Sequence, residues 1–292
     1  MKILWATTFR PFKLSVNNDI YQEIFINSLK NLNAHIEVCV TQFDDYGVEN
    51  FLSKSELKYK FINYPKKDLP CKKKYSNKIM LENALIEYCK DSNDYSFFVY
   101  STSDIIVPSN LIVELKKKEK EDSLLLIFPN TLVRNGKLLG YYDVVYGIDL
   151  IILRLSKQKA KILLEAIKDW NQYDWGINEH FLIAVSSLLK LKTSNLIKKM
   201  DLVKFENNFE SVQEDRSWQI NSWLENQKFL IYFLKKNNLS VFYAKGSYYF
   251  LLYKVFNLTD INFRLFIIYL KTFLISLPKS IMKIKNWKFF MS

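Results

Sequence analysis

The sequence has 292 residues, of which 49% are hydrophobic and 25% charged, and its formal net charge is +12. This length allows one large domain or one domain with an appendage, and the composition excludes a disordered chain. No stretch reaches the ~18 uncharged apolar residues of a membrane-spanning helix, and the first residues lack the apolar core of a signal peptide. We therefore expect a cytoplasmic protein, and its basic charge permits anionic lipid or nucleic acid as a partner.

The first hundred residues alternate between predicted strands and predicted helices. Short β-branched and aromatic runs indicate strands, and apolar residues at helical spacing indicate helices. The predicted strands are 2–9, 35–41, 59–64 and 95–100, and the predicted helices are 20–32, 48–57 and 74–89. We expect Asn17, Asn18 or Asp19 to cap the first of these helices. This order of elements favours a parallel sheet with helices on its faces.

The following residues continue the α/β pattern with more strands. Residues 105–108 are expected to continue the strand 95–100, and Asn135-Gly136 predicts a tight hairpin turn. The other predicted strands are 124–128, 131–134, 137–145 and 148–155, and the other predicted helices begin at 109 or span 157–170, 178–191 and 219–236. We expect one domain over residues 1–244 and a separate tail over 245–292.

The tail, residues 245–292, is basic and aromatic. It holds eight lysine or arginine residues and one acidic residue, Asp260, which gives it a net charge of +7. From 261 to 290, lysines are spaced among apolar residues, which predicts an amphipathic helix in a membrane interface with Trp287 at its boundary. A helix packed on the main domain is the alternative. The aromatic residues stand among aliphatic ones, so we expect no nucleic acid partner.

Three polar clusters follow predicted strands, where an open α/β sheet binds its ligands. They are Thr7-Thr8 with Arg10, Asp44-Asp45, and the segment 101–104. Asp104 closes the polar segment that follows the apolar run 95–100, and an acid in that place suits a divalent cation that neutralises a diphosphate. The alternatives are an aspartate that caps the next turn for Asp104, and a solvated turn for Asp44 and Asp45.

Other chemistries lack their motifs. The sequence has no phosphate-binding GxxxxGK[ST] loop, no GxGxxG after the first strand and no GxSxG nucleophile turn. Its three cysteines lack metal-ligand spacing, so we expect free thiols in a reducing compartment. The two histidines, His35 and His180, have no surroundings that favour a Ser-His-Asp triad.

Three segments carry a resemblance to a known family. They are residues 6–10, at the end of the first strand, 95–108 (YSFFVYSTSDIIVP) and 174–182 (DWGINEHFL). Together they resemble the inverting GT-A glycosyltransferases, in particular the family 2-like enzymes of bacterial surface polysaccharides. The likeness covers about residues 1–235 and implies a GT-A-like, nucleotide-binding mixed sheet flanked by helices. The chain departs from the family at Thr102, which replaces the first acid of the Asp-x-Asp motif.

The resemblance implies a role for each matching residue. Asp104 would ligate Mg²⁺ or Mn²⁺ on the donor diphosphate, and Ser103 would lie beside it. The nucleoside pocket would be lined by Thr7, Arg10 and Asp44 or Asp45. Asp174 or Glu179 would be the general base, and Asp149 would face the acceptor.

The expected function is therefore metal-assisted, inverting transfer of a hexose from a nucleotide sugar to a surface glycan. A lipid-linked acceptor fits the basic tail, which would hold the protein peripherally on the inner face of the cytoplasmic membrane. The alternative, which Thr102 leaves open, is a catalytically inactive, membrane-associated glycan-binding scaffold of a polysaccharide assembly system.

Overall fold

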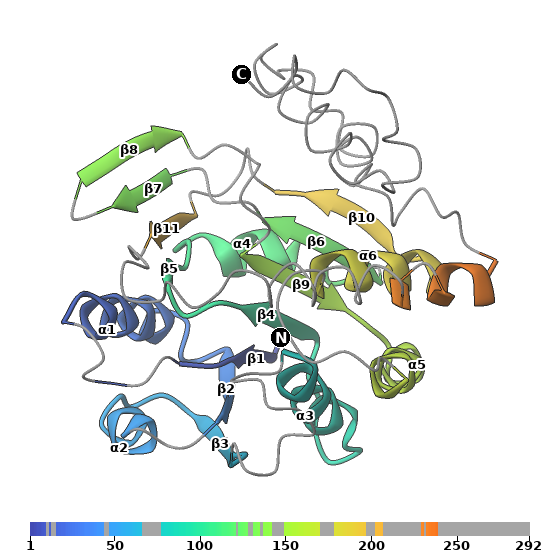
Figure 1. Ribbon diagram of the computed structural model, residues 1–292, viewed down its shortest axis with the longest axis horizontal. Helices are drawn as coiled ribbons and strands as arrows, with labels where there is room; N and C mark the ends of the chain where they lie inside the picture. The colour runs from blue at the N-terminus through green and yellow to red at the C-terminus, as the bar shows by residue number, and fades with distance from the viewer. Residues whose placement is uncertain are drawn as a thin grey trace, which may run out of the picture.

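The computed structural model describes residues 1–9, 12, 16–43, 47–65, 77–120, 122–127, 131–134, 137–141, 149–169, 178–196, 202–206, 229–230 and 232–238. Its main feature is a mixed sheet of seven strands in the order β10-β6-β9-β4-β1-β2-β3 (Figure 1). The strands are β1 (Ile3–Thr7), β2 (Ile36–Gln42), β3 (Tyr59–Asn63), β4 (Phe97–Ser101), β6 (Ser123–Ile127), β9 (Leu150–Arg154) and β10 (Lys192–Asn195).

The parallel arrangement predicted from the first hundred residues is confirmed, and one later strand, β9, makes the sheet mixed. Strands β4, β1, β2 and β3 are all parallel, and so are β10 and β6. Strand β9 runs antiparallel to both of its neighbours, β4 and β6. The last residue of β6, Ile127, pairs with the first residue of β9, Leu150. The chain thus returns at the edge of the sheet where β6 ends, so β9 runs antiparallel to β6.

Helices cover both faces of the sheet, which is therefore buried on both sides (Figure 1). One face carries α1 (Val16–Lys30), α2 (Val48–Ser53) and α4 (Leu111–Lys116), and the other carries α3 (Asn77–Cys89), α5 (Lys157–Lys168) and α6 (Asn178–Leu188). Side chains of β1 alternate between the two cores: Ile3 and Trp5 pack on the α1 side, and Leu4 and Ala6 on the α3 side. Each large side chain so buried contributes about 1.5–3 kcal/mol.

A second sheet of four strands lies beside the first, in the order β5-β11-β7-β8 (Figure 1). Its strands are β5 (Ile105–Ile106), β11 (Val203–Glu206), β7 (Thr131–Arg134) and β8 (Lys137–Tyr141). The predicted hairpin is confirmed, because Arg134 pairs with Lys137 across antiparallel strands. The expectation that 105–108 continue β4 is wrong: β4 ends at Ser101, and β5 pairs with β11 in the other sheet.

Helix boundaries differ from the sequence prediction at the start of α1. This helix begins at Val16, so Asn17, Asn18 and Asp19 lie in its first turn and do not precede it as caps. Ser156 does cap α5, since its side chain accepts a hydrogen bond from the Lys159 amide at 3.3 Å. Cys39 and Cys89 are free, as expected, while Cys71 lies outside the described residues.

The described part of the chain contains no helix long and apolar enough to cross a membrane. Within the predicted helix 219–236, residues 229–230 and 232–236 are described and helical. The predicted tail, 245–292, lies outside the described residues.

A buried ion-pair network closes the amino edge of the main sheet. Glu87 of α3 is 5% exposed and pairs with Lys60 of β3 and, at 2.6 Å, with Lys90. Asn93 Nδ2 donates a further hydrogen bond to Glu87 Oε1 at 2.6 Å. Burial alone would raise the pKa of Glu87, but these hydrogen bonds outweigh it and hold the pKa at about 2.

Glu87→Gln should therefore reduce stability in a pH-dependent way. The folded pKa lies below the unfolded one, so the ionised carboxylate stabilises the fold above about pH 4.5 and loses this effect as the pH falls toward 2. The gap between wild type and variant should reach about 3 kcal/mol at pH 6 and shrink by pH 3 in urea unfolding. Glu165→Gln removes an exposed partner of Lys168 and should show little effect at either pH.

Candidate functional site

The carboxyl end of β4 is fixed by two side chains of the neighbouring strand β1. Trp5 Nε1 donates to Ser101 Oγ at 2.8 Å, and Thr7 Oγ1 donates to the Ser101 carbonyl oxygen at 3.1 Å. All three residues are buried, so losing either bond would leave a polar atom unsatisfied away from water. These bonds set the point at which β4 ends and the polar segment 102–104 begins.

A buried glutamine fixes the segment after β1. Gln42 ends β2, and its side-chain amide pairs with the backbone of Phe9: Nε2 donates to the Phe9 carbonyl at 2.9 Å, and the Phe9 amide donates to Oε1 at 3.2 Å. The side chain thus continues the ladder between β1 and β2 by one step. It orients the chain at Phe9, immediately before Arg10.

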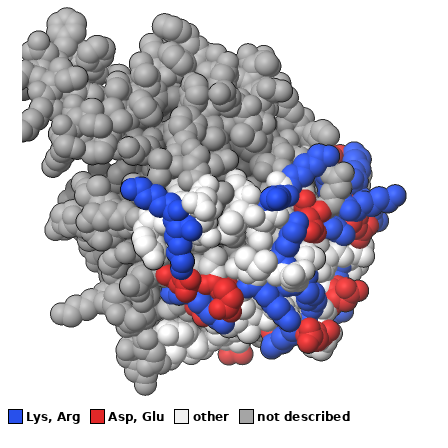
Figure 2. Space-filling view, turned by 90° about the vertical axis from the view of Figure 1, so that its right-hand side faces the viewer, with Lys and Arg blue, Asp and Glu red and all other residues white. Residues whose placement is uncertain are grey.

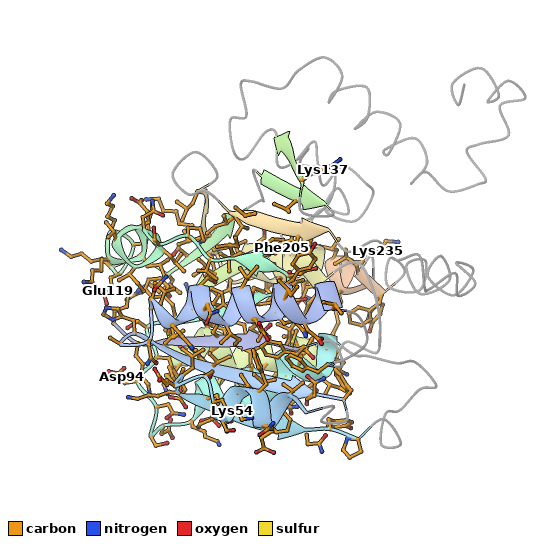
Figure 3. The ribbon with its side chains drawn as sticks, turned by 90° about the vertical axis from the view of Figure 1, so that its left-hand side faces the viewer. Lys54, Asp94, Glu119, Lys137, Phe205 and Lys235 are labelled. Carbon is orange, nitrogen blue, oxygen red and sulfur yellow. The ribbon has the colours of Figure 1, made fainter. Side chains whose placement is uncertain are left out.

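Strand β11 lies against the segment that follows β4. The Phe205 amide donates to the Asp104 carbonyl at 2.8 Å, and Lys204 pairs with Ile105 in the antiparallel β5–β11 ladder. The Phe205 ring stacks on Tyr21 of α1, with centroids 4.4 Å apart and planes 9° from parallel. Figure 3 shows Phe205 just above α1. Backbone pairing and stacking together place Lys204 beside Asp104.

Three charged side chains meet where β4, β9 and β11 come together. Lys204 Nζ lies 3.3 Å from Asp104 Oδ1 and forms a second, closer ion pair with Asp149 Oδ1. The exposed fractions of these side chains are 14% for Asp104, 8% for Asp149 and 16% for Lys204. A lysine so placed offsets the cost of burying two neighbouring carboxylates.

The antiparallel ladder places Asp149 opposite the residue that departs from the family motif. Ser101 pairs with Leu150, so one step further along the two strands Thr102 lies opposite Asp149. Burial raises the pKa of Asp149, the Lys204 ammonium opposes this rise, and the charge of Asp104 adds to it. The Thr102 hydroxyl also favours the ionised form. Yet neither Thr102 Oγ1 nor Asp149 Oδ2 has a partner of regular hydrogen-bond geometry among the described residues.

These oxygen atoms suit a hard divalent cation. Carboxylate and hydroxyl oxygens are the ligands that Mg²⁺ and Mn²⁺ prefer, and a buried oxygen without a partner gains most from a cation. Among the described residues, no group of three or more histidine, cysteine, aspartate or glutamate side chains is placed to hold a metal ion. Asp104 and Asp149 would therefore supply only part of a coordination sphere, with substrate or water oxygens completing it.

The structure brings together some of the residues predicted from the sequence. Thr7, Ser103, Asp104 and Asp149 gather at the ends of β1, β4 and β9, and Ser103 is 8% exposed. The others cannot be compared: Arg10, Asp44, Asp45 and Asp174 lie outside the described residues, as do the side chains of Glu179 and His180 in α6.

Sequence reasoning missed Lys204. The only local signal is the alternation of apolar and charged residues in β11 (VKFE), where Lys204 lies between Val203 and Phe205. Nothing within that stretch indicates a carboxylate partner a hundred residues away.

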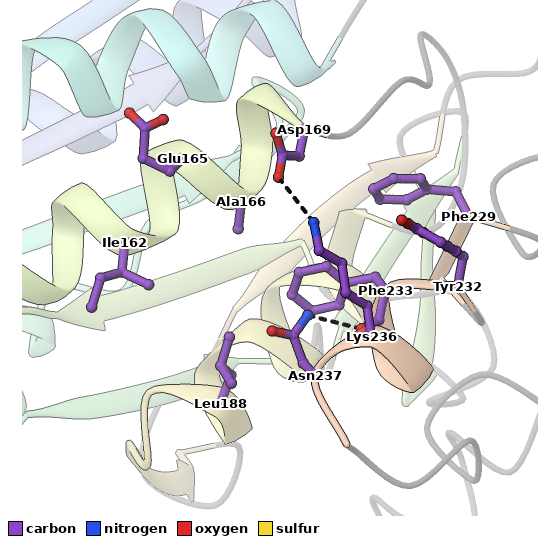
Figure 4. Close-up of a pocket in the computed structure, with 10 residues that line it drawn as sticks. All are labelled: Ile162, Glu165, Ala166, Asp169, Leu188, Phe229, Tyr232, Phe233, Lys236 and Asn237. Carbon is purple, nitrogen blue, oxygen red and sulfur yellow. Dashed lines mark hydrogen bonds and ion pairs between the residues drawn. The ribbon is translucent and has the colours of Figure 1, made fainter.

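A separate groove lies between α5 and the helical residues 229–230 and 232–236 (Figure 4). Its volume is about 430 Å³, and its walls are mainly apolar, with Phe229 and Phe233 on one side and Ile162 on the other. Lys236 Nζ lies 3.8 Å from Asp169 Oδ2 at its rim. None of its lining residues is one for which the sequence predicts a site role.

The fold has solved counterparts. The crystal structure of S. aureus TarS 1-349 superimposes with a TM-score of 0.52 and 15% sequence identity, covering 96% of this chain and 82% of that one. The same protein in complex with UDP gives a TM-score of 0.52 and 14% identity over the same shares. TarS is a GT-A-type glycosyltransferase, so the predicted GT-A-like fold is confirmed.

The sequence by itself gives no such match. No known protein-family profile matches the chain. No curated protein sequence matches it either.

Gln42→Leu tests how the segment after β1 is held. The leucine has a similar volume but cannot bond to Phe9, whose amide and carbonyl would lose their partners. Each lost partner costs about 1–3 kcal/mol, so the free energy of unfolding should fall by about 2–4 kcal/mol in urea titrations. Gln158→Leu, on the exposed side of α5, is the matched control and should change it by less than about 0.5 kcal/mol. Equal effects of the two substitutions would contradict the assignment.

Proposed function

We propose that the protein is a glycosyltransferase that moves a sugar from a nucleotide-sugar donor to a glycan acceptor. The observation that carries this proposal is Asp104, which follows the buried central strand β4 at the carboxyl edge of a GT-A-like sheet. An open α/β sheet binds its ligand at this edge. The UDP complex of TarS, a protein with a similar fold, supports a nucleotide as part of the donor.

The donor would lie along the ends of β1, β2 and β4. Asp104 would bind Mg²⁺ or Mn²⁺, which would offset negative charge on the leaving diphosphate. The segments after β1 and β2, with Arg10 and with Asp44 or Asp45, would contact the nucleoside, and the Gln42–Phe9 bonds would hold the first of them in place. Thr7 already donates its hydroxyl hydrogen to Ser101, so it would contribute to the pocket mainly by shaping it.

The transfer step follows from the chemistry of a sugar nucleotide. An acceptor hydroxyl oxygen attacks the anomeric carbon as the bond from that carbon to the diphosphate oxygen breaks, and a base takes the hydroxyl proton. A single displacement of this kind inverts the anomeric configuration. Asp174 or Glu179 is the proposed base, since a carboxylate that can reach the acceptor hydroxyl meets the need.

For Asp149 we propose a different role from the one that the resemblance implies. Its ion pair with Lys204 puts it beside Asp104, and we assign it to the donor side of the site rather than to the acceptor.

The acceptor that fits best is a lipid-linked surface glycan, which places the protein in polysaccharide biosynthesis. The sequence of the tail supports this, because interleaved lysines and apolar residues bind anionic membrane surfaces. Figure 2 shows basic side chains next to acidic ones on the face it draws, without a large patch of one charge among the described residues. We assign membrane contact to the tail on the pattern of its sequence.

Asp104→Asn should abolish transfer and leave the fold intact. The neutral amide ligates a divalent cation weakly, while Lys204 keeps its pair with Asp149. Release of nucleoside diphosphate from a panel of nucleotide sugars with Mn²⁺ should fall at least about 100-fold, with an unchanged circular dichroism spectrum. Asp94→Asn, an exposed aspartate before the opposite end of the same strand, is the control and should keep full activity.

Full activity in Asp104→Asn would contradict the metal assignment. If the wild-type protein turns over no donor but binds glycans or vesicles, the result would support the alternative of an inactive scaffold, which Thr102 leaves open.

A further inference from the structure

Thr102 stands where the Asp-x-Asp motif has its first carboxylate, and the structure places another carboxylate, that of Asp149, beside this position. Asp149 comes from β9, and the β4–β9 register places it directly across from Thr102. Lys204 bridges Asp149 and Asp104, so the two carboxylates lie within reach of one small cation. The Asp-x-Asp motif has both acids on one segment. Here Asp104 follows β4 and Asp149 precedes β9, so the two acids come from different strands.

Lys204 pairs with only one of the two carboxylate oxygens of Asp149. The Asp149 side chain is 8% exposed; its Oδ1 takes the ion pair, while Oδ2 is buried without a partner of regular hydrogen-bond geometry among the described residues. Thr102 Oγ1 is a second buried oxygen in the same condition, on the facing strand. A buried carboxylate oxygen of this kind costs free energy unless a proton or a cation satisfies it.

We propose that Asp104 and Asp149 form a divalent-cation site divided between β4 and β9, for which the Lys204 ammonium competes. The lysine charge is compact and sits on a flexible stem, so it can hold the two carboxylates together and also leave them. A divalent ion brings twice the charge to the same oxygens and can also reach Oδ2 and the Thr102 hydroxyl. The cation site itself does not depend on the proposed function. Only its role, which is to bind the donor diphosphate, rests on that function.

Direct Mn²⁺ binding, without nucleotide, tests this competition. Free Mn²⁺ is measured by electron paramagnetic resonance during titration of the full chain, in wild type and in Lys204→Gln. The glutamine amide keeps a hydrogen-bond donor for the carboxylates but removes the competing charge. Mn²⁺ should bind the variant at least about 10-fold more tightly than wild type. Lys54→Gln, on the exposed surface, removes one positive charge elsewhere and should leave the affinity within about 2-fold.

Two further variants keep the test decisive. Adding Asp149→Asn to Lys204→Gln should remove the gain in Mn²⁺ affinity. Lys204→Arg keeps the charge and can bind carboxylates in a bidentate way, so Mn²⁺ should raise its melting temperature less than that of wild type. The melting comparison decides the matter if Lys204→Gln does not fold.

The proposal is overturned if Lys204→Gln gains no affinity, as expected if a proton satisfies Asp149 Oδ2. It is overturned as well if the gain survives Asp149→Asn, if Lys54→Gln shows the same gain, or if Lys204→Arg responds to Mn²⁺ like wild type. Because no donor is present, any of these results leaves the glycosyltransferase proposal standing. Conversely, if Lys204 and Mn²⁺ compete as proposed but the protein turns over no donor, the cation site is supported and the proposed transferase function is contradicted.

Discussion

All five side chains of β4 are buried, and this constraint decides where chemistry can occur in the molecule. A strand covered by helices on both faces has no room for an unpaired charge, so charged residues come only after the strand ends. Trp5 and Thr7 fix that end by their bonds to Ser101. Asp104 follows three residues later, which places the first acid after β4 at the edge where such sheets bind ligands.

The charged group at this edge unites segments that are far apart in the sequence. Asp104 follows β4, Asp149 precedes β9, and Lys204 lies in β11 of the second sheet. Each depends on a different long-range contact: the bonds of β1 to Ser101, the antiparallel β4–β9 ladder, and the β5–β11 pairing supported by Phe205 on α1. The second sheet therefore does more than cover the edge, because it contributes the cationic member of the group.

Local patterns in the sequence predict most of the elements, and with the family resemblance they name two of the three charged residues, Asp104 and Asp149. Short apolar runs identify β1 to β4, and helical spacing identifies α1, α3, α5 and α6, since both signals depend only on neighbours along the chain. The direction of β9 does not follow from its own residues, because strand pairing is set by where the chain returns to the sheet. Strands β10 and β11 are short and weakly apolar, and the partners of Lys204 appear only when β5 and β11 meet. The sequence shows the departure at Thr102 and names Asp149, but the position of Asp149 across from Thr102 depends on the pairing of β4 with β9.

The most direct test of the account is whether a nucleotide binds at the carboxyl edge of the main sheet. The melting temperature of the full chain should be measured with nucleoside diphosphates and nucleotide sugars, each with and without Mn²⁺. A ligand at 100 times its dissociation constant stabilises the native state by about 2.7 kcal/mol, which is readily seen as a higher melting temperature. The account predicts a rise for one nucleotide class that depends on Mn²⁺. No rise with any nucleotide at millimolar concentration, with or without the metal ion, would contradict it.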